Sequence, residues 1–259
     1  MNRPLILVTN DDGISAPGIR NLIRIMNDFG DVVVVAPDGP QSGMGHAITI
    51  DATLRCDKVV IDKGPQTEYA CSGTPVDCVK LAVNQLLDRK PDLCVSGVNH
   101  GSNSSINVIY SGTMSAAVEG ALEGMPSIGF SLLDYAHNAD FFEAETYIRK
   151  VTQSVLDNGM DKGVCLNVNI PQIKKGEAIK GIKVCRQANA NWEEEFEKRV
   201  DPKGKTYYWL TGKFVNYDKG TDTDEWALAN HFVSVVPVQF DITAYPSISA
   251  LNKIFSNVE

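Results

Sequence analysis

The most restrictive feature of the chain is a series of short, continuous apolar runs that alternate with segments of helical periodicity. Residues 5–9 form the first run, residues 17–29 repeat apolar side chains at helical spacing, and residues 32–36 form the next run. Strands that are apolar at every position are typical of a parallel sheet covered on both faces. Because parallel strands joined by a helix form right-handed units, this order predicts a βαβ arrangement at the start of the chain.

The same alternation continues through the first two thirds of the chain. It predicts helices at residues 75–87, 113–122 and 141–156, and strands at residues 93–96, 127–130 and 164–169. A doubly wound, Rossmann-like α/β fold with a mostly parallel sheet is therefore expected over residues 1–170. A length of 259 residues fits one such domain with an extension, so we treat residues 1–259 as a single domain.

The C-terminal extension, residues 171–259, is alternating and rich in aromatic residues. We expect a β-hairpin around Tyr207-Tyr208-Trp209-Leu210, a helix at 224–229, a strand at 232–236 and a last helix at 248–255. A two-stranded hairpin is marginal in water unless its apolar face is covered. Residues 187–217 are therefore predicted to form a projecting arm that reaches a partner subunit. The alternative is a hairpin that folds back on its own sheet.

Charge and cysteine usage exclude several classes of protein. A net charge of −8 and a pI near 5.1 argue against broad binding to nucleic acid or anionic membranes, because either needs a basic face. An anionic substrate would need a local positive feature, such as a cation or a helix N-terminus.

The six cysteines contain no Cys-x-x-Cys pair and are interpreted as reduced, buried thiols. With no signal peptide or membrane span in evidence, a cytoplasmic location is expected.

Polar loops follow the predicted parallel strands at their carboxyl ends, where open α/β sheets bind ligands. The first loop contains Asn10-Asp11-Asp12-Gly13, the second contains Ser42-Gly43, and the third contains Asn99 and Asn103. Adjacent carboxylates raise each other's pKa unless a positive charge lies between them. Together with a hydroxyl and an amide oxygen, the pair forms an all-oxygen ligand set for Mg²⁺, Mn²⁺ or Ca²⁺. The alternative is that Asp11 and Asp12 cap the following helix and fill a turn.

The segment Tyr110-Ser111-Gly112-Thr113 opens a predicted helix. Backbone N–H groups and hydroxyls at such a helix start can bind a phosphate group. Simple N-capping by Ser111 is the alternative, and the two interpretations are compatible. The stretch lacks Gly-x-x-x-x-Gly-Lys, which excludes a triphosphatase P-loop.

On these motifs the chain resembles the survival protein E (SurE) nucleotidases. The residues that carry the resemblance are Val8 to Gly13, Ser42-Gly43, Ser96 to Asn103, Tyr110 to Thr113, Ala116 to Gly120, Leu166 to Pro171, Asp201 to Gly204, Tyr207 to Trp209, and the region from Thr223 to Val235. The resemblance implies hydrolysis of nucleoside 5′- and 3′-monophosphates, one divalent cation per subunit, Mg²⁺ or Mn²⁺, and homodimers or homotetramers that exchange C-terminal segments. Gly45-His46 and Pro40-Gln41 depart from the family's pattern, which leaves substrate preference open.

The resemblance also implies roles for particular residues. It assigns the cation to Asp11, Asp12, Ser42 and Asn99, catalysis to Asp11, Asp12 and Asn99, and substrate binding to Asn10, Gly43, Asn103, Ser111, Gly112 and Thr113. The expected mechanism is hydrolysis by a metal-activated water. His46 and His100 fall in the same loops, and each can be a surface residue, a local hydrogen-bonding group or a substrate contact.

Other chemistries and classes remain as alternatives. A haloacid-dehalogenase-type phosphatase would attack with an aspartate, but that family has Asp-x-Asp after its first strand, whereas here the acids are adjacent and preceded by Asn10. A phospho-receiver signalling module would need a later phospho-acceptor aspartate and a downstream lysine. The loops that hold Ser42 and Asn99 lack that arrangement.

Overall fold

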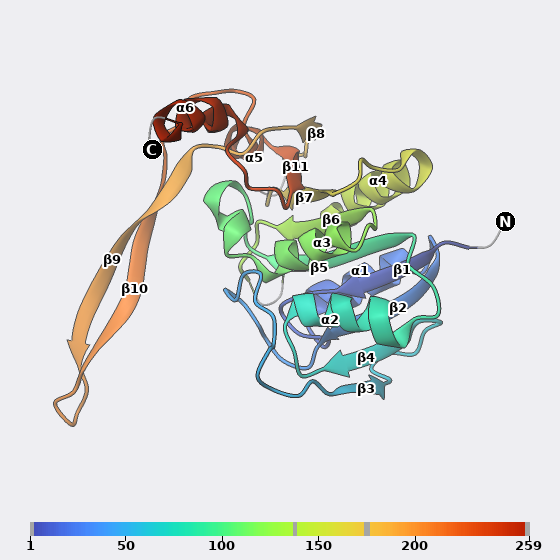
Figure 1. Cartoon of the computed structure of the whole chain (residues 1–259). Helices are drawn as coiled ribbons and strands as arrows, with labels where there is room; N and C mark the ends of the chain where they lie inside the picture. Colours follow the sequence, from blue (N-terminus) through green and yellow to red (C-terminus); the bar gives the residue numbers. More distant parts are fainter. Residues whose placement is uncertain (1–2, 137–138, 174–176, 257–259) are drawn as a thin grey trace.

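The structure is a computed structural model and describes residues 3–136, 139–173 and 177–256. Its centre is a nine-stranded sheet with the strand order β3-β4-β2-β1-β5-β6-β7-β11-β8 (Figure 1). The middle strands are parallel, namely β4 (Thr67–Cys71), β2 (Asp31–Pro37), β1 (Leu5–Thr9), β5 (Leu93–His100), β6 (Ser127–Leu132) and β7 (Val164–Ile170). The predicted α/β class with a mostly parallel sheet is confirmed.

The edges of the sheet carry antiparallel pairings that the sequence did not reveal. β3 (Cys56–Val59) runs antiparallel to β4, β11 (Phe232–Gln239) runs antiparallel to β7, and β8 (Gly181–Val184) pairs with β11. The sequence predicts a strand at residues 232–236, within β11, but it predicts none at β3, β4 or β8. β3 and β8 are short and partly exposed, so they lack the continuous apolar runs that marked the inner strands.

Helices cover both faces of the sheet. The side chains of α1 (Pro17–Met26) and α4 (Phe142–Asn158) share one apolar cluster with β1, β2, β5, β6 and β7. α2 (Pro75–Leu81) and α3 (Gly112–Leu122) pack on the opposite face, where Leu7, Val35 and Cys94 point. A π-helical turn, η1 (Ala82–Leu86), extends α2, and a 3₁₀ turn, η2 (Ser105–Ile109), leads into α3. Both layers of a doubly wound fold are thus present.

The C-terminal extension leaves the body of the molecule. β9 (Ala190–Val200) and β10 (Thr206–Asn216) form a separate two-stranded antiparallel sheet that projects as a long arm (Figure 1). Asp201 closes its turn, because its side chain accepts hydrogen bonds from the backbone of Lys203 and Lys205 at 2.8 Å each.

α5 (Asp224–Ala229) and α6 (Tyr245–Phe255) complete the order of elements, and α6 has no buried residue. No helix in the described part of the chain is long and apolar enough to cross a membrane.

One expectation about cysteines is wrong. Cys56 and Cys71 form a disulfide between β3 and β4, with their Cα atoms 4.0 Å apart. The two residues face each other in the antiparallel register of this strand pair, which brings together thiols 15 positions apart in the chain. Spacing alone could not reveal the bond, because neither strand was predicted. Cys78, Cys94, Cys165 and Cys185 are free and buried, as expected.

Candidate active site

The polar loops converge at the carboxyl ends of β2, β1 and β5, which are neighbours in the sheet. The backbone N–H of Gln41 donates a hydrogen bond to the carbonyl oxygen of Asp11 at 2.7 Å, which holds the loop of Ser42 and Gly43 against the acid pair. From the other side, His100 at the end of β5 acts to lower the pKa of Asp12. Residues distant in sequence are therefore assembled around Asp11 and Asp12.

Asp11 lies against the N-terminus of α3 and is only 3% exposed. The hydroxyl of Thr113 donates a hydrogen bond to its Oδ1 at 2.5 Å, and the backbone N–H groups of Gly112 and Thr113 also contact the carboxylate. Burial raises the pKa of Asp11 above its ordinary value, although these hydrogen bonds act in the opposite direction. An acid that is buried in this way needs further positive charge to be stable as a carboxylate.

Helix capping does not account for the acid pair. The N-cap of α1 is Ala16, which makes no side-chain cap, so neither Asp11 nor Asp12 has this role. At the start of α3 the hydroxyl of Ser111 accepts the backbone N–H of Met114 at 3.0 Å. The capping interpretation is therefore confirmed for Ser111. Its hydroxyl proton remains available to another acceptor, since capping uses only a lone pair of the oxygen.

Asp12 combines a buried, unpartnered oxygen with a raised pKa. Its Oδ2 is buried and has no hydrogen-bond partner. Burial raises the pKa of Asp12 from 3.8 to about 6, and the nearby charge of Asp11 adds a smaller part of this shift. The buried carboxylate of Asp11 and the half-buried carboxylate of Asp12, with its unpartnered oxygen, fit a hard divalent cation, which would satisfy both.

The remaining proposed ligands supply oxygen atoms. The side-chain nitrogen of Asn99 donates to the carbonyl oxygen of Gly101 at 3.0 Å, which leaves the amide oxygen as its available ligand atom. Ser42 is exposed on its loop, next to Gly43, whose φ of 76° is left-handed. The described residues contain no group of three or more His, Cys, Asp or Glu side chains able to hold a metal ion. A cation at Asp11 and Asp12 would therefore depend on hydroxyl, amide or water oxygens.

Asn10 and Asn103, predicted to bind substrate, are both buried. The side-chain nitrogen of Asn10 donates to the carbonyl oxygen of Gly13 at 3.0 Å, within the loop that carries the acids. The side-chain nitrogen of Asn103 donates to the hydroxyl of Ser131 at 2.8 Å. Both amide nitrogens are thus used inside the protein, where they fix the shape of their loops.

Two asparagines on β7 support the third loop, a role that their sequence pattern does not predict. The backbone N–H of Asn103 donates to the Oδ1 of Asn169, and the side chain of Asn167 donates to the carbonyl oxygen of Asn103, both at 2.8 Å. Asn169 also donates to Asn167 at 2.8 Å, so the network is closed. The available signal was two asparagines within a strand that is otherwise apolar and buried.

The two histidines of the site loops have different surroundings. Nε2 of His46 lies 2.9 Å from Oε2 of Glu119, and Nζ of Lys80 lies 2.7 Å from the other oxygen of this buried carboxylate. Burial alone would raise the pKa of Glu119, but hydrogen bonds from His46 and Lys80 lower it. His46 therefore ties the loop of Ser42 to α3. The ring of His100 packs edge to face on Phe141, with the centroids 5.4 Å apart.

Comparison with known proteins places this arrangement in a family. A sequence model described as Survival protein SurE matches residues 6–194. The chain is 68% identical over 252 residues to a protein of Flavobacterium psychrophilum named 5'-nucleotidase SurE, covering 97% of this chain and 98% of that protein. A protein of the same name from Cytophaga hutchinsonii is 58% identical over 254 residues, covering 98% and 97%.

A solved structure agrees with the sequence relatives. The crystal structure of a Sure protein from Aquifex aeolicus superposes with a TM-score of 0.83 at 38% sequence identity, covering 97% of this chain and 100% of that chain. The match therefore includes the C-terminal extension as well as the Rossmann-like core. The chain belongs to the survival protein SurE family.

Proposed function

We propose that the protein is a 5'-nucleotidase, a metal-dependent phosphomonoesterase that hydrolyses nucleoside 5′- and 3′-monophosphates to nucleoside and phosphate. The observation that carries the proposal is the position of the buried Asp11 carboxylate against Gly112 and Thr113 at the start of α3. A carboxylate pair and a helix N-terminus then border the same space, which suits a cation and a phosphate group. The names of the relatives support the same activity.

We assign one divalent cation, Mg²⁺ or Mn²⁺, to Asp11, Asp12, Ser42 and Asn99. The unpartnered Oδ2 of Asp12 and the available amide oxygen of Asn99 support this ligand set. When bound, such a cation polarises a phosphoryl oxygen and lowers the pKa of water. A ligand set completed by hydroxyl and amide oxygens agrees with the described residues, which contain no group of three or more His, Cys, Asp or Glu side chains able to hold a metal ion.

The residues of the chain would bind the phosphate group and accept the proton of the attacking water. The hydroxyl of Ser111 and the backbone N–H groups near Gly43 and Gly112 would bind its oxygens and stabilise the charge that develops on them. Asp12, the more exposed acid, would orient the attacking water and accept its proton. The new bond forms between the water oxygen and phosphorus, the ester bond breaks, and the departing nucleoside oxygen takes up a proton. Asn10 and Asn103 would act through the loops that they hold.

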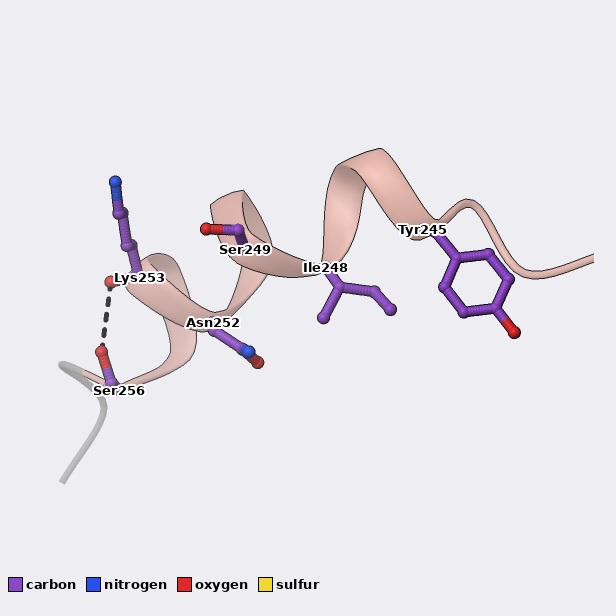
Figure 2. A pocket seen from close by; sticks show the side chains of 6 residues that line it. All are labelled: Tyr245, Ile248, Ser249, Asn252, Lys253 and Ser256. Atoms are coloured by element: carbon purple, nitrogen blue, oxygen red, sulfur yellow. Dashed lines mark hydrogen bonds between the residues drawn. The ribbon is translucent and has the colours of Figure 1, made fainter.

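Assembly into homodimers or homotetramers with exchanged C-terminal segments is part of the proposal. Phe196, Tyr208 and Leu210 on the arm are each at least 60% exposed, which a stable monomer rarely tolerates on one hairpin. Figure 2 shows a pocket on α6 that is lined by residues of this helix, including Tyr245, Ile248 and Asn252, and by its C-cap Ser256. It is remote from the acid pair in sequence and lies on an element with no buried residue, so it suits a protein partner better than a substrate. The cytoplasmic location stays a prediction.

A substrate panel tests the proposed activity. Phosphate release should be measured with nucleoside 5′- and 3′-monophosphates, polyphosphate and sugar phosphates, each with and without Mg²⁺ or Mn²⁺. We expect cation-dependent release from the nucleoside monophosphates at the highest kcat/KM. Release from sugar phosphates or polyphosphate alone would contradict the assignment of the substrate class.

A further inference from the structure

A buried acid in the C-terminal extension contacts the third polar loop of the proposed site. Asp224, the first residue of α5, is only 1% exposed. Its Oδ2 accepts the backbone N–H of Ser105 at 2.8 Å. Its Oδ1 accepts the backbone N–H of Ala188 at 2.9 Å and that of Glu225 at 2.8 Å. Hydrogen bonds from N–H groups to a carboxylate are among the stronger ones in proteins, so Asp224 fixes Ser105 and Ala188 relative to α5.

The two segments that Asp224 joins belong to different parts of the molecule. Ser105 begins η2 and follows the loop of Asn103, whereas Ala188 precedes β9, the first strand of the arm. The hydroxyl of Ser105 also lies 2.9 Å from the carbonyl oxygen of Ala188 and 3.1 Å from that of Ala190. The third loop is therefore joined to the base of the arm directly through this hydroxyl and indirectly through Asp224.

The backbone conformation of Ser105 is unusual and depends on these contacts. Its φ of 52° lies in the left-handed region, which residues other than glycine rarely adopt. Such a conformation persists where the surrounding structure fixes it, and it is frequent at functional sites. Both donors of Ser105, its backbone N–H and its hydroxyl, are used in this way. Loss of the bond to Asp224 should let the chain at Ser105 relax to a commoner conformation.

Ser105 lies between two parts of the proposed site. Before it, the backbone and side chain of Asn103 are bonded to β7 and β6. After it, η2 leads to Ser111, the N-cap of α3. The loop is thus held by the sheet on one side and by Asp224 on the other. A relaxed Ser105 would displace Asn103 or the entry to α3 relative to the acid pair.

We propose that Asp224 and Ser105 form a positioning pair for phosphate-ester hydrolysis, a role that rests on the proposed nucleotidase function. Asp224 acts through Ser105. It holds the loop of Asn103 and the entry to α3 in the geometry that stabilises the charge developing on the phosphate group. The C-terminal extension, to which Asp224 belongs, thereby contributes to catalysis within its own chain.

Asp224→Asn tests the pair with little change in shape. The amide has one acceptor oxygen where the carboxylate has two, so its NH₂ group must face a backbone N–H, either that of Ser105 or those of Ala188 and Glu225. Because a displacement of about 1 Å can cost about a hundredfold in rate, we expect kcat for AMP to fall by between about tenfold and about a hundredfold. KM for AMP should change by less than about threefold, since the lost stabilisation belongs to the transition state.

Asp222→Asn is the matched control. The side chain of Asp222 is 66% exposed just before the same helix, and it pairs with Arg186 at 2.9 Å. This variant should keep kcat and KM within about twofold of the wild type, because surface substitutions have small effects. Cation affinity is a second control: Asp11 and Asp12 follow β1, outside the loop that Asp224 holds. Calorimetry should therefore give the same Mn²⁺ affinity for Asp224→Asn and the wild type.

Hydrogen exchange separates positioning from support of the fold. In Asp224→Asn the backbone N–H groups of residues 102–106 should exchange at least about tenfold faster, while those of β1 keep the wild-type rate. A merely structural role would lower protection across the whole sheet and leave kcat per folded molecule unchanged.

Ser105→Ala tests the pair independently, including the case in which Asp224→Asn does not fold. The variant keeps the backbone N–H that Asp224 accepts and loses only the hydroxyl contacts to Ala188 and Ala190. Loss of one hydrogen bond should lower kcat for AMP by between about threefold and about tenfold.

Different failures lead to different conclusions. A wild type that does not hydrolyse AMP contradicts the proposed function, and the positioning role with it. A wild type that hydrolyses AMP, together with a folded Asp224→Asn that has the wild-type kcat, overturns the positioning pair alone. The pair is also overturned if Asp224→Asn loses protection equally across the sheet, or if Ser105→Ala keeps the wild-type kcat.

Discussion

A Cβ atom on Gly112 would lie 2.6 Å from the Cβ of Asp11, so the start of α3 and the acid loop approach each other as closely as a residue without a side chain allows. This contact places the helix N-terminus beside the acid pair. It also explains why the position is a glycine, even though its backbone does not require one: any other residue would separate the two elements.

Gly112→Ala should therefore damage the site while leaving the fold intact. The added methyl group must move α3 or the loop of Asp11, and a displacement of about 1 Å near reacting groups can cost about a hundredfold in rate. We expect a loss of this order in kcat/KM for AMP, with an unchanged circular dichroism spectrum. Gly39→Ala is the control, because a Cβ there would meet no atom within 4 Å. Equal rates in the two variants would show that the close approach is unimportant.

Cation binding should release protons at acidic pH. In the metal-free protein the pKa of Asp12 is raised from 3.8 to about 6, so between these values the native state holds a proton that the unfolded chain has lost. The metal-free fold is therefore destabilised as the pH rises through this window, and a cation, which needs the ionised acid, binds more tightly over the same range. Asp11, whose pKa burial also raises, adds to the effect.

Calorimetry in buffers of different ionisation enthalpy measures this linkage. At pH 5 the binding of Mn²⁺ should release about one proton or more, and at pH 8 almost none. Asp12→Asn should reduce the release at pH 5. Binding without proton release at pH 5 would contradict a cation site that includes Asp12.

No covalent phosphoenzyme should form during turnover. Asp11 is buried, and its Oδ1 is occupied by the hydroxyl of Thr113, so it is poorly placed to attack phosphorus. Acid quenching during hydrolysis of AMP, followed by peptide mass spectrometry, should find no phosphorylated aspartate. A phosphoaspartate at Asp11 or Asp12 would favour the haloacid-dehalogenase type of mechanism.

The arm should hold subunits together. Light scattering at micromolar concentration should give a mass at least twice that of the 28.2 kDa chain, and deletion of residues 192–214 should give a soluble monomer. Phe196→Asp, at a position 65% exposed on β9, should weaken assembly, whereas Lys198→Ala on the same strand should not. A fully active wild-type monomer would mean that the arm works within its own chain.

The fold is predictable from the sequence where local patterns are strong. Continuous apolar runs identified β1, β2, β5, β6 and β7, and the strand ends correctly indicated which loops converge. The short, partly exposed strands β3 and β8 carry no such run, and with β3 the disulfide of Cys56 and Cys71 was missed as well.

Contacts within the site were harder to predict than its location. The adjacent acids and the Tyr-Ser-Gly-Thr motif predict where the proposed site lies, and the structure brings Asp11 and Thr113 together. The bond from Thr113 to Asp11 spans 102 positions, and that between His46 and Glu119 spans 73, so each depends on how two elements pack. The inward orientation of Asn103 likewise depends on Ser131 and Asn169, which lie on neighbouring strands.

The most direct test of the central claim is phosphate release from AMP as a function of cation in the wild type and in Asp11→Asn. The wild type should lose activity in excess chelator and recover it with Mg²⁺ or Mn²⁺, because an all-oxygen site holds these ions reversibly. Asp11→Asn should fold normally but lose at least about a hundredfold in cation affinity, while Asp38→Asn, an exposed acid at the same edge of the sheet, should behave like the wild type. Full turnover in chelator, or a near wild-type rate for Asp11→Asn at equal metal occupancy, would contradict the account.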